Sequence, residues 1–137
     1  PELTALVLTS RGDSGEDGLL HAYEIFDLKL QAEIVVLSGC DTALGREVSG
    51  EGLIGLTQAL FFAGAHSVVV SLWPVADSAS PFLMPEFYRR LELGETKAEA
   101  LRQTKLAMLG TDRWAHPFYW AQFVLLGDGS HLPLPRS

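Results

Sequence analysis

The segment IVVLSGCDTALG, residues 34–45, places the single cysteine of the chain directly after a run of aliphatic residues. Such a run predicts a buried strand, and Ser38 and Gly39 predict its end. Cys40 therefore follows a strand, where its thiolate could act as a nucleophile if a neighbouring base lowered the pKa of the thiol. A lone cysteine can equally be a small buried apolar residue, so both interpretations are open at this point.

The four histidines are the candidate bases for this cysteine. In open parallel sheets, functional residues lie outside the carboxyl ends of the strands. His66 and His116 each precede a predicted strand, so both are expected at the opposite, amino edge. His21 lies in a predicted short helix, and His131 lies in the C-terminal tail. The sequence therefore predicts no resident base beside Cys40 and contains only half of a catalytic pair.

Alternating strands and helices predict the scaffold that positions these residues. Strands are expected over residues 3–10, 33–38, 67–73 and 120–127. Helices are expected over residues 20–26, 52–64, 78–91 and 96–109. The middle two strands are continuous apolar runs, typical of strands covered on both faces, and the last helix opens on the capping box Thr96 to Glu99. This order predicts an α/β fold with a mostly parallel sheet.

Composition predicts one globular domain over residues 1–137, ending in a loose proline-rich tail over residues 128–137. No apolar run reaches the ~20 residues of a membrane span, so no membrane partner is expected. The net charge of −7 argues against a nucleic-acid partner. A single cysteine forms no internal disulfide, which favours a reducing, cytoplasmic location. No residue spacing indicates a metal site, and no cofactor is expected.

Several motifs in one order resemble the CHAT family of caspase-like cysteine peptidases. They are the cysteine motif itself, DGLLHAYEI before it, GEGLIGLTQALFFAGAHSVVVSLWPVAD after it, and the closing HPFYWAQFVLLGD. The resemblance implies a three-layer α/β/α caspase-like sandwich and a cysteine endopeptidase in which Cys40 attacks a peptide carbonyl. A protein or peptide is then the substrate. Because the family is often found behind helical repeats, a helical-repeat region of the same protein is an expected partner.

The resemblance also implies that the catalytic base lies upstream of this chain. In the family, the histidine belongs to a His-Gly motif, and no His-Gly pair occurs in this sequence. We therefore expect a C-terminal portion of the domain, with the base and at least one strand before Pro1 and the sheet incomplete on its N-terminal side. An exposed sheet edge favours self-association. The alternative is a catalytically inactive CHAT-type interaction or regulatory module.

Four further residues are candidates for substrate binding. Gly39 precedes the nucleophile, and Asp41 follows it, where a carboxylate could bind a basic substrate side chain or cap loop backbone. Trp73 could form a wall of the substrate cleft or plug the end of the sheet. Asp77 is either the N-cap of the next helix or part of a pocket.

Two other features have less direct functional interpretations. A thiol hydrolase with a nucleophile elbow, such as a glutamine amidotransferase, is disfavoured because a loop separates Cys40 from the helix that begins near Gly52. The crowded residues Trp114, His116, Phe118, Tyr119 and Trp120 favour a packed aromatic edge over a binding platform.

Overall fold

The computed structural model describes residues 5–7, 19–37, 50–73 and 79–133. The chain divides into two compact units, the first formed by residues 1–32 and 41–65 and the second by residues 33–40 and 66–137. No helix of the described ranges is long and apolar enough to cross a membrane.

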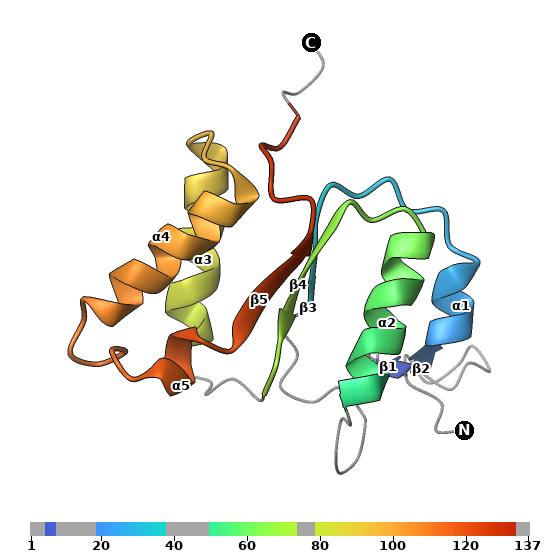
Figure 1. Cartoon of the computed structure of the whole chain (residues 1–137), viewed down its shortest axis with the longest axis horizontal. Coiled ribbons are helices and arrows are strands. Elements are labelled where there is room, and N and C mark those ends of the chain that lie inside the picture. Colours follow the sequence, from blue (N-terminus) through green and yellow to red (C-terminus); the bar gives the residue numbers. More distant parts are fainter. Residues whose placement is uncertain (1–4, 8–18, 38–49, 74–78, 134–137) are drawn as a thin grey trace, which may run out of the picture. The chain divides into compact units, whose positions relative to one another are not determined.

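In the first unit, a short hairpin-like sheet precedes two helices (Figure 1). Strand β1 (Ala5–Val7) pairs antiparallel with β2 (Leu19–His21). Helix α1 (Ala22–Phe26) packs along α2 (Gly50–Phe62), where the rings of Phe26 and Phe62 meet edge to face at 5.2 Å. The core of this unit includes Ile25, which is fully buried.

The start of α1 corrects the expectation of a helix from residue 20. Residues Leu19–His21 form a strand, and the helix begins only at Ala22. The backbone N–H of His21 donates a hydrogen bond to the Glu24 carboxylate at 2.8 Å, which satisfies a donor at the helix start. Leu20 and His21 therefore pair with β1 and do not join the helix.

The second unit contains a sheet of order β3-β4-β5. Strand β3 (Val35–Leu37) lies parallel to β4 (Ser67–Ser71), and β5 (Phe123–Gly127) lies antiparallel to β4. The expectation of a mostly parallel sheet is therefore wrong for the described strands, because only the β3–β4 pair is parallel. The chain remains a mixed α/β protein, as predicted.

Helices α3 (Ser80–Glu92), α4 (Lys97–Leu109) and α5 (Pro117–Trp120) complete this unit. Its core joins α3 and α4 to β4 and β5 through Leu83, Phe87, Met108, Val69 and Phe123, all fully buried. The central strand β4 buries Val68, Val69 and Val70 completely, which confirms the predicted run of inaccessible residues. This core holds β4 and β5 against α3 and α4.

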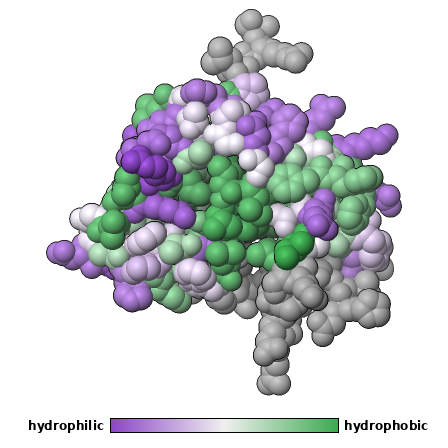
Figure 2. All heavy atoms as spheres, in the orientation of Figure 1, coloured by the Kyte–Doolittle hydropathy of each residue, from purple (hydrophilic) through white to green (hydrophobic). Residues whose placement is uncertain are grey.

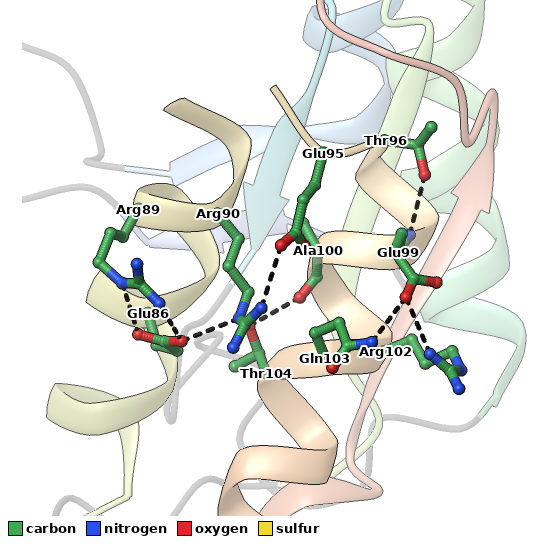
Figure 3. Close-up of polar contacts among 10 residues, drawn as sticks. All are labelled: Glu86, Arg89, Arg90, Glu95, Thr96, Glu99, Ala100, Arg102, Gln103 and Thr104. Carbon is green, nitrogen blue, oxygen red and sulfur yellow. Dashed lines mark hydrogen bonds and ion pairs between the residues drawn. The ribbon is translucent and has the colours of Figure 1, made fainter. Parts of the chain in front are cut away.

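The first turn of α4 contains one half of the predicted capping box (Figure 3). The hydroxyl of Thr96 accepts a hydrogen bond from the Glu99 backbone N–H at 3.0 Å. The Glu99 carboxylate accepts instead from Arg102 and Gln103 one turn further along the helix. On α3, the Glu86 carboxylate bonds Arg89 and Arg90, and hydrogen bonds from both arginines hold the pKa of Glu86 below its usual value.

A buried lysine joins the start of α4 to the sheet. The ammonium of Lys97 is fully buried and donates to the Glu33 carbonyl oxygen at 3.1 Å. The backbone N–H groups of Lys97 and Ala98 donate to the carbonyl oxygens of Ser130 and Gly129. The expected loose tail therefore starts with residues anchored on α4, while residues 134–137 lie outside the described ranges.

Candidate functional site

The candidate site lies along one edge of the β3-β4-β5 sheet, here called the carboxyl rim. It is defined by Leu37 and Ser71, the last residues of β3 and β4, and by Phe123, the first residue of β5. In the register, Leu37 pairs with Val70, and Ser71 pairs with Phe123. The last residues of β3 and β4 thus lie at the same edge of the sheet as α5, which leads into β5 (Figure 1).

Most of the predicted site residues follow the described part of these strands. Gly39, Cys40 and Asp41 come after β3, and Asp77 comes after β4 and Trp73. These four residues lie outside the described residues. Trp73 is the member of the predicted site that the structure describes.

Trp73 is attached to α5. Its indole Nε1–H donates a hydrogen bond to the carbonyl oxygen of Phe118 at 3.0 Å. The two rings stack with centroids 6.3 Å apart and an interplanar angle of 25°. The Ser71 hydroxyl donates to the Trp73 carbonyl oxygen at 2.5 Å and fixes the turn after β4. Since Trp73 is half-buried and Phe118 is exposed, their rings form an accessible aromatic wall at the rim.

His116 also lies at the carboxyl rim, which corrects its expected place at the amino edge. It is the N-cap of α5, and α5 precedes β5. The expectation rested on a parallel last strand, whose start would lie at the opposite edge. Because β5 is antiparallel to β4, its start lies beside the end of β4. One described histidine is therefore on the same edge as Leu37, the last residue of β3.

The cap hydrogen bond nevertheless determines the chemistry of His116. Its Nδ1 accepts from the Phe118 backbone N–H at 3.1 Å. A neutral imidazole that accepts through Nδ1 carries its proton on Nε2. A general base needs a free lone pair within reach of the proton that it removes. In this arrangement neither ring nitrogen offers one, so His116 must break its helix cap before it can accept a proton.

The other histidines belong to other elements of the two units. His66 Nδ1 contacts the Glu33 carboxylate at 3.1 Å, at the amino ends of β3 and β4, as the sequence predicts. His21 is the N-cap of α1 in the first unit, and His131 is exposed after β5. The His66–Glu33 contact belongs to the opposite end of the sheet from the carboxyl rim.

The aromatic residues around α5 form a packed edge, as predicted. Tyr119 contacts the rings of Trp114 at 5.1 Å and Phe118 at 5.5 Å, both edge to face. The indole of Trp120 donates to the Ala115 carbonyl oxygen at 3.0 Å. These contacts hold the short helix in place and therefore also hold the partner of Trp73.

A further residue at the rim, which is not among the predicted site residues, is Gln122. This residue is fully buried between α5 and β5, and its Nε2 donates to the Tyr119 carbonyl oxygen at 2.9 Å. Its Oε1 has no hydrogen-bond partner within the described ranges. A glutamine next to the apolar run FVLLG was the signal that could have identified it.

Comparisons with known proteins agree with this arrangement of motifs. Residues 1–128 match the family model described as CHAT domain. The chain is 38% identical over 119 residues to Tetratricopeptide repeat protein 28 of Mus musculus and 37% identical over 119 residues to that of Homo sapiens. Each alignment covers 87% of this chain but only 5% of the relative. The chain therefore belongs to the CHAT domain family.

Proposed function

We propose that this chain is part of a caspase-like cysteine endopeptidase domain in which Cys40 is the nucleophile. The observation that supports this proposal best is the parallel register of β3 and β4, in which Leu37 pairs with Val70. Cys40 follows Leu37 by a few residues, and Trp73 follows the paired strand. In this proposal Cys40 would lie at the carboxyl edge with Trp73 in the wall beside it, as a nucleophile at the floor of a substrate cleft does.

The proposed chemistry is acyl transfer. The Cys40 thiolate attacks the carbonyl carbon of the substrate, and the tetrahedral oxyanion accepts a hydrogen bond from the Cys40 backbone N–H. The C–N bond then breaks as an imidazolium gives its proton to the leaving amine, which leaves a thioester. Water attacks this thioester with the imidazole as base and releases the acid and the thiol. Trp73 and Phe118 would then lie along the bound peptide.

We propose that the imidazole comes from a His-Gly segment outside this chain. The positions of the described histidines support this. His66 contacts Glu33 at the amino ends of the strands, and His116 engages its Nδ1 in a helix cap. Within the caspase-like, three-layer α/β/α arrangement that we propose, the additional segment would supply the base and a further oxyanion donor.

A second candidate function is a non-catalytic interaction or regulatory module. The capped tautomer of His116 favours it for this chain on its own, because this histidine of the rim uses its Nδ1 in the helix cap and is not free to activate a thiol. The name of these relatives refers to tetratricopeptide repeats, which are helical. A helical-repeat region of the same protein is therefore our proposed partner, and the lone cysteine favours a reducing, cytoplasmic compartment.

The experiment that tests the endopeptidase compares two polypeptides on a mixture of unmodified peptides. One is this chain, and the other adds a His-Gly segment of the family pattern before Pro1. We expect the longer form to cleave peptides and Cys40→Ala in that form to abolish cleavage, while this chain is inactive. Mass spectrometry of the products identifies the cut bonds. A longer form that binds peptides without cutting them would support the interaction module instead.

A further inference from the structure

A groove separate from the carboxyl rim lies between α4 and β5 in the second unit. It encloses about 450 Å³, and its apolar walls are Leu101, Leu106 and Leu109 of α4, with Trp120 of α5 and Leu125 of β5. Leu106 and Leu109 are each about half exposed, at 45% and 48%. Figure 2 shows hydrophobic residues gathered over β5 with polar residues around them.

Among the described residues that line this groove, two are cations and none is a carboxylate. Arg102 is paired with the Glu99 carboxylate at 2.8 Å. Lys105 has no ion-pair or hydrogen-bond partner within the described ranges, although it is half-buried in an apolar setting. This desolvation lowers the pKa of Lys105. An unpaired, half-buried ammonium is unfavourable unless an anion comes to it.

The outer edge of β5 is the second observation. Leu72 N–H donates to the Gln122 carbonyl and Asp128 N–H to the His66 carbonyl, so these are hydrogen-bonded pairs of the antiparallel ladder. Hydrogen-bonded pairs alternate with non-hydrogen-bonded pairs along an antiparallel ladder. Phe123, Leu125 and Gly127 belong to non-hydrogen-bonded pairs, so their backbone N–H and C=O groups point away from β4. They have no backbone partner within the described ranges, where β5 is an edge strand. An edge of this kind can accept an added strand.

We propose that β5 binds an extended peptide segment of a partner protein as an added antiparallel strand, with aliphatic side chains in the groove and an acidic side chain at the Lys105 ammonium. Residues opposite each other on paired strands place their side chains on the same face. A partner residue opposite Leu125 therefore faces α4, and its neighbours two positions away do the same. If aliphatic and acidic residues alternate on that face of the partner strand, the aliphatic side chains contact the apolar walls and the acidic side chain pairs with the Lys105 ammonium.

The probe is a short capped peptide in which leucine, glutamate and leucine alternate with threonine, labelled with fluorescein and followed by fluorescence anisotropy. A matched peptide carries lysine in place of glutamate. Two further peptides are N-methylated. In one, the leucine and glutamate nitrogens, which would face β5, are blocked. In the other, only the threonine nitrogens, which would face away, are blocked. The protein variants are Lys105→Glu and the control Lys29→Glu, an exposed lysine of the first unit.

We expect the glutamate peptide to bind and Lys105→Glu to weaken it about tenfold, with the lysine peptide regaining affinity for that variant. Lys29→Glu should bind like the unchanged protein. Methylation of the leucine and glutamate nitrogens should abolish binding, and methylation of the threonine nitrogens should leave it intact. Peptide affinity that is the same for Lys105→Glu and the unchanged protein, or for the two methylated peptides, would overturn the proposal. So would failure of the glutamate peptide to bind, including the case in which sedimentation shows β5 occupied by a second copy. None of these outcomes depends on Cys40 or on peptide cleavage.

Discussion

The indole of Trp73 donates a hydrogen bond to the carbonyl oxygen of Phe118 at 3.0 Å, 45 residues further along the chain. This contact attaches the segment after β4 to the helix that precedes β5. The aromatic wall of the candidate site therefore depends on the antiparallel direction of β5, which brings α5 to the carboxyl rim. The stability of the second unit and the shape of the rim are linked through this pair.

Replacing Trp73 with phenylalanine tests this link. Trp73→Phe keeps an aromatic ring beside Phe118 but removes the Nε1–H donor. We expect the free energy of unfolding to fall by about 1 kcal/mol, the typical net value of a neutral hydrogen bond. Urea unfolding measured by circular dichroism gives this value. Phe118→Leu is the matched control, since it keeps the carbonyl acceptor and loses only the ring contacts with Trp73 and Tyr119. Equal stability of Trp73→Phe and the unchanged protein would show that the hydrogen bond adds nothing.

A glycine after α2 allows a close backbone contact in the first unit. Gly64 has φ of 111°, and a Cβ added there would lie 2.1 Å from the Leu30 carbonyl oxygen. We expect Gly64→Ala to destabilise α1 and α2 by more than about 2 kcal/mol, because the backbone must shift and a positive φ is unfavourable for alanine. Hydrogen exchange of the helix amides measures this loss.

Gly55 provides the matched control for that substitution. It lies within α2, and a Cβ added there meets no atom within 4 Å. Gly55→Ala should therefore slow hydrogen exchange in α2, because alanine favours the helix over glycine. The free energy of opening of the helix should rise by up to about 1 kcal/mol. Equal effects of the two substitutions would contradict the assigned role of Gly64.

The buried Lys97 permits a comparison of charge with volume. Its ammonium lies 3.9 Å from the Glu33 carboxylate and 3.8 Å from the Asp128 carboxylate, which are 36% and 50% exposed. Lys97→Met keeps most of the volume, and both carboxylates stay hydrated. The Glu33 carbonyl also keeps its bond from Ser67. We expect a loss of about 1 kcal/mol for methionine and about 3 kcal/mol for alanine, which leaves a cavity.

Tryptophan fluorescence during urea unfolding distinguishes these outcomes, because Trp73, Trp114 and Trp120 all belong to the second unit. If methionine destabilises as much as alanine, the charge of Lys97 and not its packing holds α4 to the sheet.

Asp128 should contribute to acid stability. Its backbone hydrogen bond from Ser130, together with that from the Ser130 hydroxyl, lowers the pKa of Asp128 below its usual value. A carboxyl whose pKa is lower in the folded state stabilises the fold above its unfolded pKa, and this contribution is lost as pH falls through the folded pKa. Below about pH 4, the unchanged protein should therefore lose stability more steeply than Asp128→Asn. Glu92→Gln is the control, and a parallel decline for Asp128→Asn would contradict this role.

Local signals predicted the elements of the second unit well. The Thr96 cap, the buried valines of β4 and the aromatic edge around Tyr119 each depend on nearby residues, so the sequence contains the information. The direction of β5 does not depend on nearby residues. A helical connection can lead into either direction of the strand, and FVLLG is apolar enough to be buried in both. The resulting error placed His116 at the wrong edge.

The candidate site could be predicted only in part for a related reason. Trp73 was identified from the motif after β4, but its partner Phe118 and the buried Gln122 come together only through the fold. Pairing of β2 with β1 likewise overrides the helical pattern that begins near Leu20. The candidate residues Gly39, Cys40, Asp41 and Asp77 lie outside the described ranges, so their roles stay predictions.

The most direct test of the account is the pH dependence of Cys40 alkylation in this chain. The single cysteine makes the reaction unambiguous. We predict a rate that rises with an apparent pKa near 8.5, the value of an unactivated thiol, and that is unchanged in His116→Gln. An apparent pKa below about 7 that returns to the ordinary value in His116→Gln would show that a histidine of this chain activates Cys40, and it would contradict the proposal of an external base.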